Sequence, residues 1–290
     1  MGKVLRQFQY TFQLYRHRFF QMRTGILLIL LFGAMDLDYA GLARAVKGLD
    51  YPASPWFILS VMTNDFMCAA VGLGAVYLFS GAPYLNRNGM YQMIRVGKRR
   101  WAAAQLGSIV AGSFSFTISL FLMGLLYQFP RIDWTASWGK MLHTLSLTNA
   151  AQEFDLTFGL SYAFLQQIDG WQAALLAFVL DSLVFTLLGF LLFGLGLCFG
   201  RTVALACTGF LAVLPFSSQV FGMHNFYWLH RISPVSWLQT GLFFTKNYIY
   251  EAMPPVTVVL GLSLVYILIA VGITALGIHR NQFKWNGETE

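Results

Sequence analysis

Six stretches of this sequence are long and apolar enough to cross a lipid bilayer, and they constrain the fold more than any other feature. A membrane-spanning helix needs about 20 predominantly apolar residues. Stretches of this kind occupy residues 20–39, 56–80, 102–127, 171–200, 202–221 and 256–278. Only 11% of the 290 residues are charged and 57% are hydrophobic, which is far from the balance of a soluble domain. The sequence therefore predicts an all-α, polytopic membrane protein with six transmembrane helices in one transmembrane domain, residues 1–290.

The Lys and Arg residues predict the orientation of these spans. With six spans, 13 of the 19 Lys and Arg residues fall on the side that holds both termini. Segments rich in these residues stay on the cytoplasmic side of a membrane. We therefore expect a cell membrane protein with both termini cytoplasmic and with external segments at 129–170 and 222–254. Because the positive charge follows the membrane topology, the net charge of +7 does not indicate nucleic-acid binding.

Residues 4–19 have the pattern of an amphipathic helix. Apolar and polar side chains recur three or four residues apart on two different faces. The apolar set is Val4, Phe8, Phe12, Tyr15 and Phe19, and the polar set is Arg6, Gln9, Gln13 and Arg16. A basic amphipathic helix just before a span predicts an N-terminal interfacial helix on the cytoplasmic surface. The alternative is a cytosolic extension of the first span.

The segment between the second and third spans, 86–101, is the most basic part of the chain. Its sequence, NRNGMYQMIRVGKRRW, holds five Lys and Arg residues and no acid. Apolar side chains among these cations predict a short helix with an apolar side, as protein interfaces combine an apolar centre with a charged rim. The predicted docking residues for a soluble partner are Met90, Met93, Ile94, Arg95, Lys98, Arg99, Arg100 and Trp101. The alternative is that the cations bind anionic lipid headgroups.

Polar side chains inside the apolar stretches mark a candidate substrate path. A carboxyl group within a span is costly and usually faces the protein interior or a wet cavity. The candidates are Asn64, Asp65, Asp181, Ser217, Ser218 and Gln219. The structural alternative is that these groups hydrogen-bond to neighbours and hold helices in register. Pro215 either kinks the fifth span or ends its regular part.

Signatures of catalysis are not found in this sequence. It lacks a G-x-x-x-x-G-K-[ST] loop, an H-E-x-x-H pair and a G-x-S-x-G elbow. Only four glutamates occur, none of them within a predicted span. Cys68, Cys198 and Cys207 all fall in apolar stretches, so we predict neither a disulfide nor a metal site. We expect no catalytic residue and no cofactor in this chain.

Three features resemble the membrane subunit of a type-2 ATP-binding-cassette exporter. The first is an amphipathic N-terminal helix followed by six spans with both ends inside. The second is MIRVGKRRW, 93–101, which is similar to the coupling segment that contacts the ATPase in that family. The third is RISPVSWLQTGLFF, 231–244, which is similar to the family's segment after span five. Ser233 stands in it where Asn is usual.

The resemblance implies the partners and the function. It implies two ABC ATPase subunits that carry ATP and Mg, and a second membrane subunit, identical or homologous. It also implies short re-entrant helices before the last span, with Ser233, Pro234 and Trp237 at an external gate. The resemblance does not give the cargo. The aromatic residues between 226 and 244 suit an amphipathic cargo, such as a peptide, a lipid or a drug-like molecule, or else form an ordinary interfacial aromatic belt. The alternative is a non-transporting immunity or sensor protein that binds a peptide or a protein partner.

Overall fold

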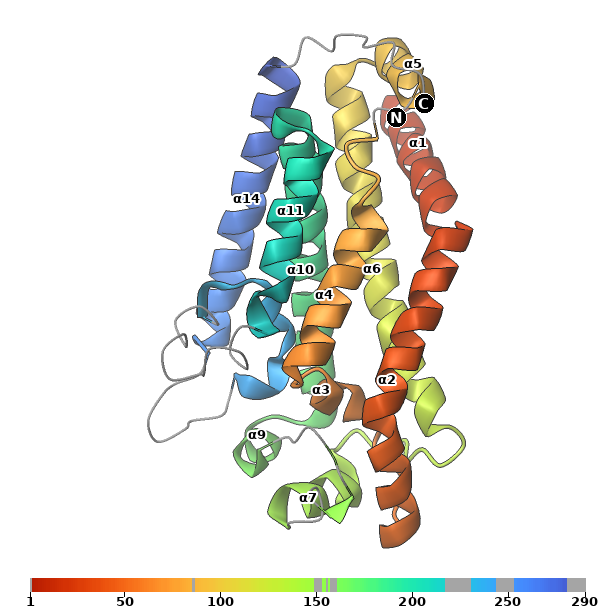
Figure 1. The fold of residues 1–290 in the computed structure, drawn as a ribbon, viewed down its shortest axis with the longest axis vertical. Helices are drawn as coiled ribbons and strands as arrows, with labels where there is room; N and C mark the ends of the chain where they lie inside the picture. The colour runs from red at the N-terminus through yellow and green to blue at the C-terminus, as the bar shows by residue number, and fades with distance from the viewer. Residues whose placement is uncertain are drawn as a thin grey trace.

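The computed structural model describes residues 2–84, 87–148, 153–154, 156, 161–216, 231–243 and 253–280. These residues form a bundle of long helices, and no β-strand occurs among them (Figure 1). The predicted all-α class is therefore confirmed for this part of the chain. Four helices are long and apolar enough to cross a membrane. They are α2 (Met22–Leu49), α6 (Lys98–Gln128), α10 (Gly170–Phe199) and α14 (Val256–Arg280).

Shorter elements surround these four helices. Helix α5 lies at one end of the bundle, where α1 and α6 begin and α14 ends, whereas α7 and α9 lie at the other end (Figure 1). The shorter α-helices are α1 (Gly2–Phe19), α3 (Ile58–Val61), α4 (Asp65–Phe79), α5 (Arg87–Val96), α7 (Gly139–Leu147), α9 (Tyr162–Gln167) and α11 (Arg201–Val213). The 3-10 turns are η1 (Pro55–Phe57), η2 (Leu214–Phe216), η3 (Val235–Leu238) and η4 (Thr240–Leu242).

Helix α2 is longer than the predicted first span. The first predicted span ends at residue 39, but the helix continues to Leu49 and ends at Asp50, whose φ is 52°. Tyr39, Leu42 and Ala45 are buried at a spacing of three residues, so one apolar stripe continues beneath the charged positions of the last turns. Its 28 residues span about 42 Å, against about 30 Å of hydrocarbon in a bilayer.

The second predicted span, 56–80, is not one helix. The segment Pro55–Val61 and helix α4 are bent by 96° at a short break. Asn64 ends the break as the N-cap of α4, with its side-chain oxygen accepting from Phe66 N at 3.0 Å. The side chain of a polar N-cap residue accepts a hydrogen bond from a backbone amide that the break leaves without a helical partner. Counted as one broken span, this pair raises the number of candidate spans from four to five.

The fifth predicted span, 202–221, is represented by a shorter helix. Apolar helix structure runs over Arg201–Phe216, with Pro215 in the closing 3-10 turn η2. Proline lacks the N–H that an α-helix needs at this point, so the regular part ends here, as one of the two readings of Pro215 predicts. Ser217, Ser218 and Gln219 lie outside the described residues.

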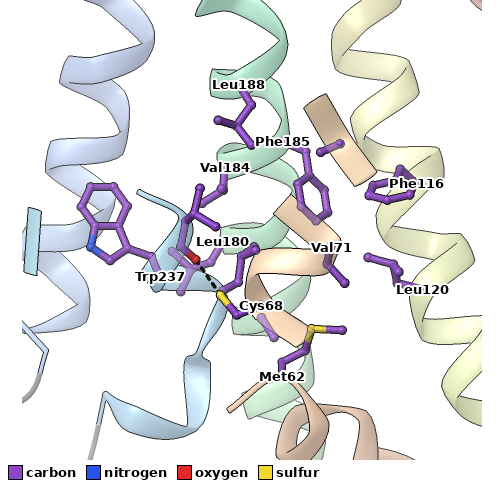
Figure 2. Close-up of a cluster of buried hydrophobic side chains, with 14 of the residues drawn as sticks. Met62, Cys68, Val71, Phe116, Leu120, Leu180, Val184, Phe185, Leu188 and Trp237 are labelled. Atoms are coloured by element: carbon purple, nitrogen blue, oxygen red, sulfur yellow. Dashed lines mark hydrogen bonds between the residues drawn. The ribbon is translucent and has the colours of Figure 1, made fainter. Parts of the chain in front are cut away.

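The core of the bundle lies where α4, α6 and α10 meet. Phe116 and Phe185 pack edge to face with ring centroids 5.0 Å apart. Figure 2 shows these rings among the apolar side chains that surround Cys68 and Trp237. The cluster also contains Met62, Val71, Leu120, Leu180, Val184 and Leu188, all buried. Close packing at this level joins the second, third and fourth apolar segments into one unit.

Candidate functional site

The end of the bundle that holds α5 presents a mixed basic and apolar surface. We call the exposed side chains of α5 and the first turn of α6 the α5 surface. It consists of Tyr91, Gln92, Ile94, Arg95, Lys98, Arg99 and Arg100. Ile94 is 75% exposed and Tyr91 is 57% exposed, although both are large and apolar. A helix that exposes such side chains among cations has the composition of a protein-binding surface.

Glycine at position 97 separates the two helices of this surface. Its φ is 90° and nothing lies within 4 Å of the position that a Cβ would occupy. Its amide donates to Met93 O at 2.9 Å, and its carbonyl accepts from Trp101 N at 3.0 Å. The turn at Gly97 therefore ends α5 and begins α6, and it needs a residue that adopts positive φ without strain.

Two predicted docking residues point into the protein instead. Met93 is 5% exposed and Trp101 is fully buried. The Trp101 ring lies 5.6 Å from that of Phe193 in α10, and its N–H has no hydrogen-bond partner among the described residues. Met90 is half-buried. In this structure Met93 and Trp101 anchor the α5 surface to the bundle, and they are not part of its exposed face.

Helix α1 braces the α5 surface through hydrogen bonds. The Tyr10 hydroxyl donates to Gln92 Oε1 at 3.0 Å, and Gln7 Nε2 donates to Arg100 O at 2.9 Å. Burial of the phenol raises the pKa of Tyr10. The opposite face of α1 exposes Phe8 and Phe12, which belong to the predicted apolar face. The side of α1 that contacts α5 and α6 therefore includes polar residues, and part of its apolar face is open.

Arginines from two other helices bind the C-terminal end of α4. Arg23 Nη2 donates to the carbonyls of Tyr77 and Leu78 at 3.0 and 3.1 Å, and Arg201 Nε donates to Ser80 O at 2.9 Å. The last carbonyls of a helix have no partner within it and carry partial negative charge. Guanidinium groups from α2 and α11 satisfy them and tie three helices together.

A further arginine lies between α1 and α6. The Arg18 guanidinium carbon lies 3.5 Å from the centroid of the Tyr84 ring, and Nη1 donates to Ser108 Oγ at 3.0 Å. Burial lowers the pKa of Arg18 and raises the pKa of Tyr84, while the interaction between the two side chains opposes both shifts. This contact fixes the junction of α1 and α2 against the bundle.

A second polar region lies at the break before α4, where the sequence predicts part of a substrate path. Asn64 Nδ2 donates to Asp38 Oδ1 in α2 at 3.2 Å, while the Asn64 side-chain oxygen caps α4. Asp65 is 7% exposed, and its Oδ1 accepts from Gln239 Nε2 at 2.5 Å. The same Gln239 nitrogen donates to Thr63 O at 3.2 Å. These bonds favour the structural alternative for Asn64 and Asp65.

Asp181 lies in the same part of the bundle but differs in its environment. It is 4% exposed, and its Oδ1 has no hydrogen-bond partner among the described residues. The carboxyls of Asp65 and Asp181 both act electrostatically on the thiol of Cys68. The structure thus brings the two predicted intramembrane acids to one region, where the Asp65 carboxyl accepts a hydrogen bond from Gln239.

The segment 231–243 packs inside the bundle. Ser233, Pro234 and Trp237, the predicted gate residues, are buried. Trp237 Nε1 donates to Arg231 O at 3.2 Å, and its ring stacks on Tyr266 at 5.7 Å. This segment contains the 3-10 turns η3, which contacts α4 and α10, and η4, which contacts α3 and α10. The remainder of 222–254, except 253 and 254, lies outside the described residues.

The turn η3 approaches α4 closely. Cys68 Sγ donates to the carbonyl of Val235 at 3.1 Å, the dashed contact in Figure 2. A Cβ at Gly72, one turn further along α4, would lie 2.9 Å from a Val235 methyl group. A glycine is therefore needed where the turn meets the helix.

Sequence reasoning missed two residues of these regions. Gln239 bridges the break and the η3–η4 segment, but its partner Asp65 is 174 positions away, so no local pattern signals the pair. Tyr91 lies on the exposed face of α5, three residues before Ile94. Tyr91 lies three and four residues before Ile94 and Arg95, and this helical spacing predicts that the three side chains share one face of α5.

Within the described ranges, no group of three or more His, Cys, Asp or Glu side chains is placed to hold a metal ion. The polar groups at the break are hydroxyl, amide and carboxyl groups, which suit hydrogen bonding. Comparison with protein-family models, curated proteins and solved structures found no match to this chain.

Proposed function

We propose that this chain is the membrane subunit of an ATP-driven exporter and that a separate ATPase docks on the α5 surface. The observation that supports this proposal most is the exposure of Ile94 and Tyr91 within a rim of four cations. A surface that only binds lipid headgroups needs charge alone. An apolar centre with a charged rim suits a soluble protein partner.

Rigid attachment supports a role in transmitting movement. Met93 and Trp101 pack the α5 surface against the bundle, and Gln7 and Tyr10 connect it to α1. Movement of a docked ATPase therefore reaches α1, α6 and α10 together. Energy enters through a difference in the partner's affinity for two conformations of the membrane subunit.

In the proposed topology the chain crosses the cell membrane six times. The broken pair Pro55–Phe79 forms the second segment and Arg201–Phe216 begins the fifth. Both termini are cytoplasmic, on the side of the α5 surface. α1 lies at the interface with Phe8 and Phe12 toward lipid, and η3–η4 belong to the re-entrant part of the external side. A second membrane subunit, identical or homologous, completes the exporter.

We place the cargo path beside the break before α4, near Asp65 and Asp181. A break in a spanning segment is tolerated where protein or water covers its open backbone groups, and here Gln239 and Asn64 do so. The proposed cargo is amphipathic, because the buried side chains around the break are mostly apolar and few are polar.

The test is co-purification from native membranes with the chain as bait. The variant Arg95→Ala/Arg99→Ala removes two cations from the α5 surface, and Ile94→Ser removes its apolar centre. The matched control Arg44→Ala/Lys140→Ala removes two exposed cations far from α5 in the sequence. We expect an ATPase of about 25–35 kDa with the unmodified chain and the control, and a loss of at least about tenfold with both α5 variants.

Two results would contradict the proposal. Equal recovery of the ATPase with all variants would exclude the α5 surface as its docking site. Absence of any ATPase, with the chain folded in every sample, would instead favour the non-transporting immunity or sensor protein, whose peptide or protein partner would then be sought in the same samples.

A further inference from the structure

A separate cavity lies between the last turns of α2 and the end of α6. Its volume is about 220 Å³, whereas one buried water needs about 10–15 Å³ of the same measure. Tyr39 and Leu42 line it from α2, and Gln128 and Phe129 from the end of α6. These helix ends lie at the opposite end of the bundle from α5 (Figure 1).

Two buried polar side chains of this cavity, Gln128 and Tyr39, lack a hydrogen-bond partner within the part of the chain that the structure describes. Gln128 is 5% exposed, and neither its amide nitrogen nor its amide oxygen has a hydrogen-bond partner in the described part of the chain. The Tyr39 hydroxyl lies beside this amide without completing a hydrogen bond of good geometry. Buried polar side chains are nearly always hydrogen-bonded in native proteins. Two buried polar side chains in one cavity, without hydrogen-bond partners among the described residues, therefore indicate a ligand that hydrogen-bonds to both of them.

Two cations define the charge of that ligand. Lys47 and Arg131 also line the cavity, and both are exposed. No ion pair of either is found within the described residues. The described residues that line the cavity include no acid, and Asp38, which acts electrostatically on Tyr39, accepts a hydrogen bond from Asn64. Two cations, a hydroxyl and an amide N–H are together four donor groups, which suit an oxyanion.

The position of the cavity indicates where the oxyanion comes from. Both helices are long enough to cross a membrane, and the cavity lies at their ends, where lipid headgroups meet the protein. The lining includes Leu42, Val46 and Phe129, and Phe129 is 75% exposed. An apolar wall beside cations fits a phosphate that carries acyl chains better than a free ion.

We propose that the cavity between α2 and α6 binds the headgroup of an anionic phospholipid, with its phosphate held by Arg131 and Lys47 and hydrogen-bonded by Gln128 and Tyr39. This site is distinct from the α5 surface, and its existence does not depend on an ATPase partner. In the topology proposed above it takes a lipid from the outer leaflet.

Binding is tested on the full-length chain in detergent by native mass spectrometry and by thermal unfolding. The probes are phosphatidylglycerol in mixed micelles, phosphatidylcholine in the same micelles, and inorganic phosphate alone. We expect one retained phosphatidylglycerol and a raised Tm, with affinity at least about tenfold above that for phosphatidylcholine, because only the former has a net charge to match the cations. Inorganic phosphate should give no shift at the same concentration.

Three variants connect the binding to the cavity. Arg131→Gln and Gln128→Leu should each weaken phosphatidylglycerol binding by about tenfold or more, whereas Lys140→Gln, an exposed cation outside the cavity, should leave it unchanged. Gln128→Leu should also raise the Tm of the lipid-free chain, because it removes an unpaired buried amide. This variant keeps the test informative if Arg131→Gln fails to fold.

Three outcomes would overturn the proposal. Equal affinity for phosphatidylcholine would remove the requirement for an anionic lipid. Stabilisation by inorganic phosphate equal to that by phosphatidylglycerol would assign the site to a free anion. Undiminished phosphatidylglycerol binding by Gln128→Leu would show that the lipid binds elsewhere on the protein.

Discussion

The hydrogen bond between Gln239 and Asp65 should couple two distant parts of the chain by a measurable free energy. Gln239 is fully buried, and its Nε2 lies 2.5 Å from Asp65 Oδ1 and 3.2 Å from Thr63 O. Hydrogen bonds to charged groups contribute about 1.5–3 kcal/mol in soluble proteins, whereas side-chain bonds in a membrane protein average about 0.6 kcal/mol and reach about 1.7. We therefore expect this short, buried hydrogen bond to a carboxyl oxygen to contribute about 1–2 kcal/mol to the free energy of unfolding, near the upper end of the membrane-protein range.

A single substitution would not isolate the free energy of the Gln239–Asp65 hydrogen bond. Gln239 Oε1 is buried without a partner in the described part of the chain, so Gln239→Leu loses two hydrogen bonds but also relieves an unpaired acceptor. The assay is therefore a double-mutant cycle with Asp65→Leu, Gln239→Leu and the double variant, followed by unfolding in detergent. The cycle cancels the effects that each replacement has on its own.

A control comes from the same 3-10 segment. Ser236 is fully buried and its hydroxyl has no partner among the described residues, so the cycle of Ser236→Ala with Asp65→Leu should be additive within about 0.5 kcal/mol. A Gln239–Asp65 coupling below about 0.5 kcal/mol would refute the reasoning, because the η3–η4 segment would then be held at the break by packing alone.

Three further changes test other contacts. Gly97→Ala should cost about 1–2 kcal/mol in unfolding free energy because φ is 90° there, whereas an unchanged stability would place the α5–α6 turn in another conformation. Gly72→Ala should destabilise the chain by about 1–3 kcal/mol through overpacking against Val235; Gly25→Ala, with nothing near its Cβ, serves as the control and should not destabilise. Arg23→Met should cost about 1–2 kcal/mol, since the Leu78 carbonyl loses its arginine donor and the Tyr77 carbonyl keeps only its bonds from Ser80, and a loss below about 0.5 kcal/mol would show that water replaces the guanidinium.

Parts of this structure follow from short-range patterns in the sequence. Runs of apolar residues predict α6, α10 and α14, and the alternation of apolar and basic residues predicts the short helix α5 at 86–101. These elements are local, so the residues that define each helix also lie within it.

Other parts depend on contacts that a local pattern does not contain. The break at 62–64 lies in a continuous apolar run, and it is satisfied by Gln239 from far along the chain. The extension of α2 to Leu49 was obscured by charged residues on its open face. The inward direction of Met93 and Trp101 depends on Phe193 and on α1, and composition alone does not distinguish an anchor from a contact residue.

Few residues of other helices cover α14, and this affects the order in which the helices of the bundle assemble. Only 17% of its most apolar window is buried, and its contacts are concentrated on α10, where Gly277 approaches Leu197 and Gly194 approaches Thr274. This helix is also synthesised after every other described element. We expect nascent chains that stop at Phe243 to enter the membrane with the other helices already paired, so that protease protection of α6 in arrested chains should equal that in the finished protein. The last helix would then close a bundle that has formed before it arrives.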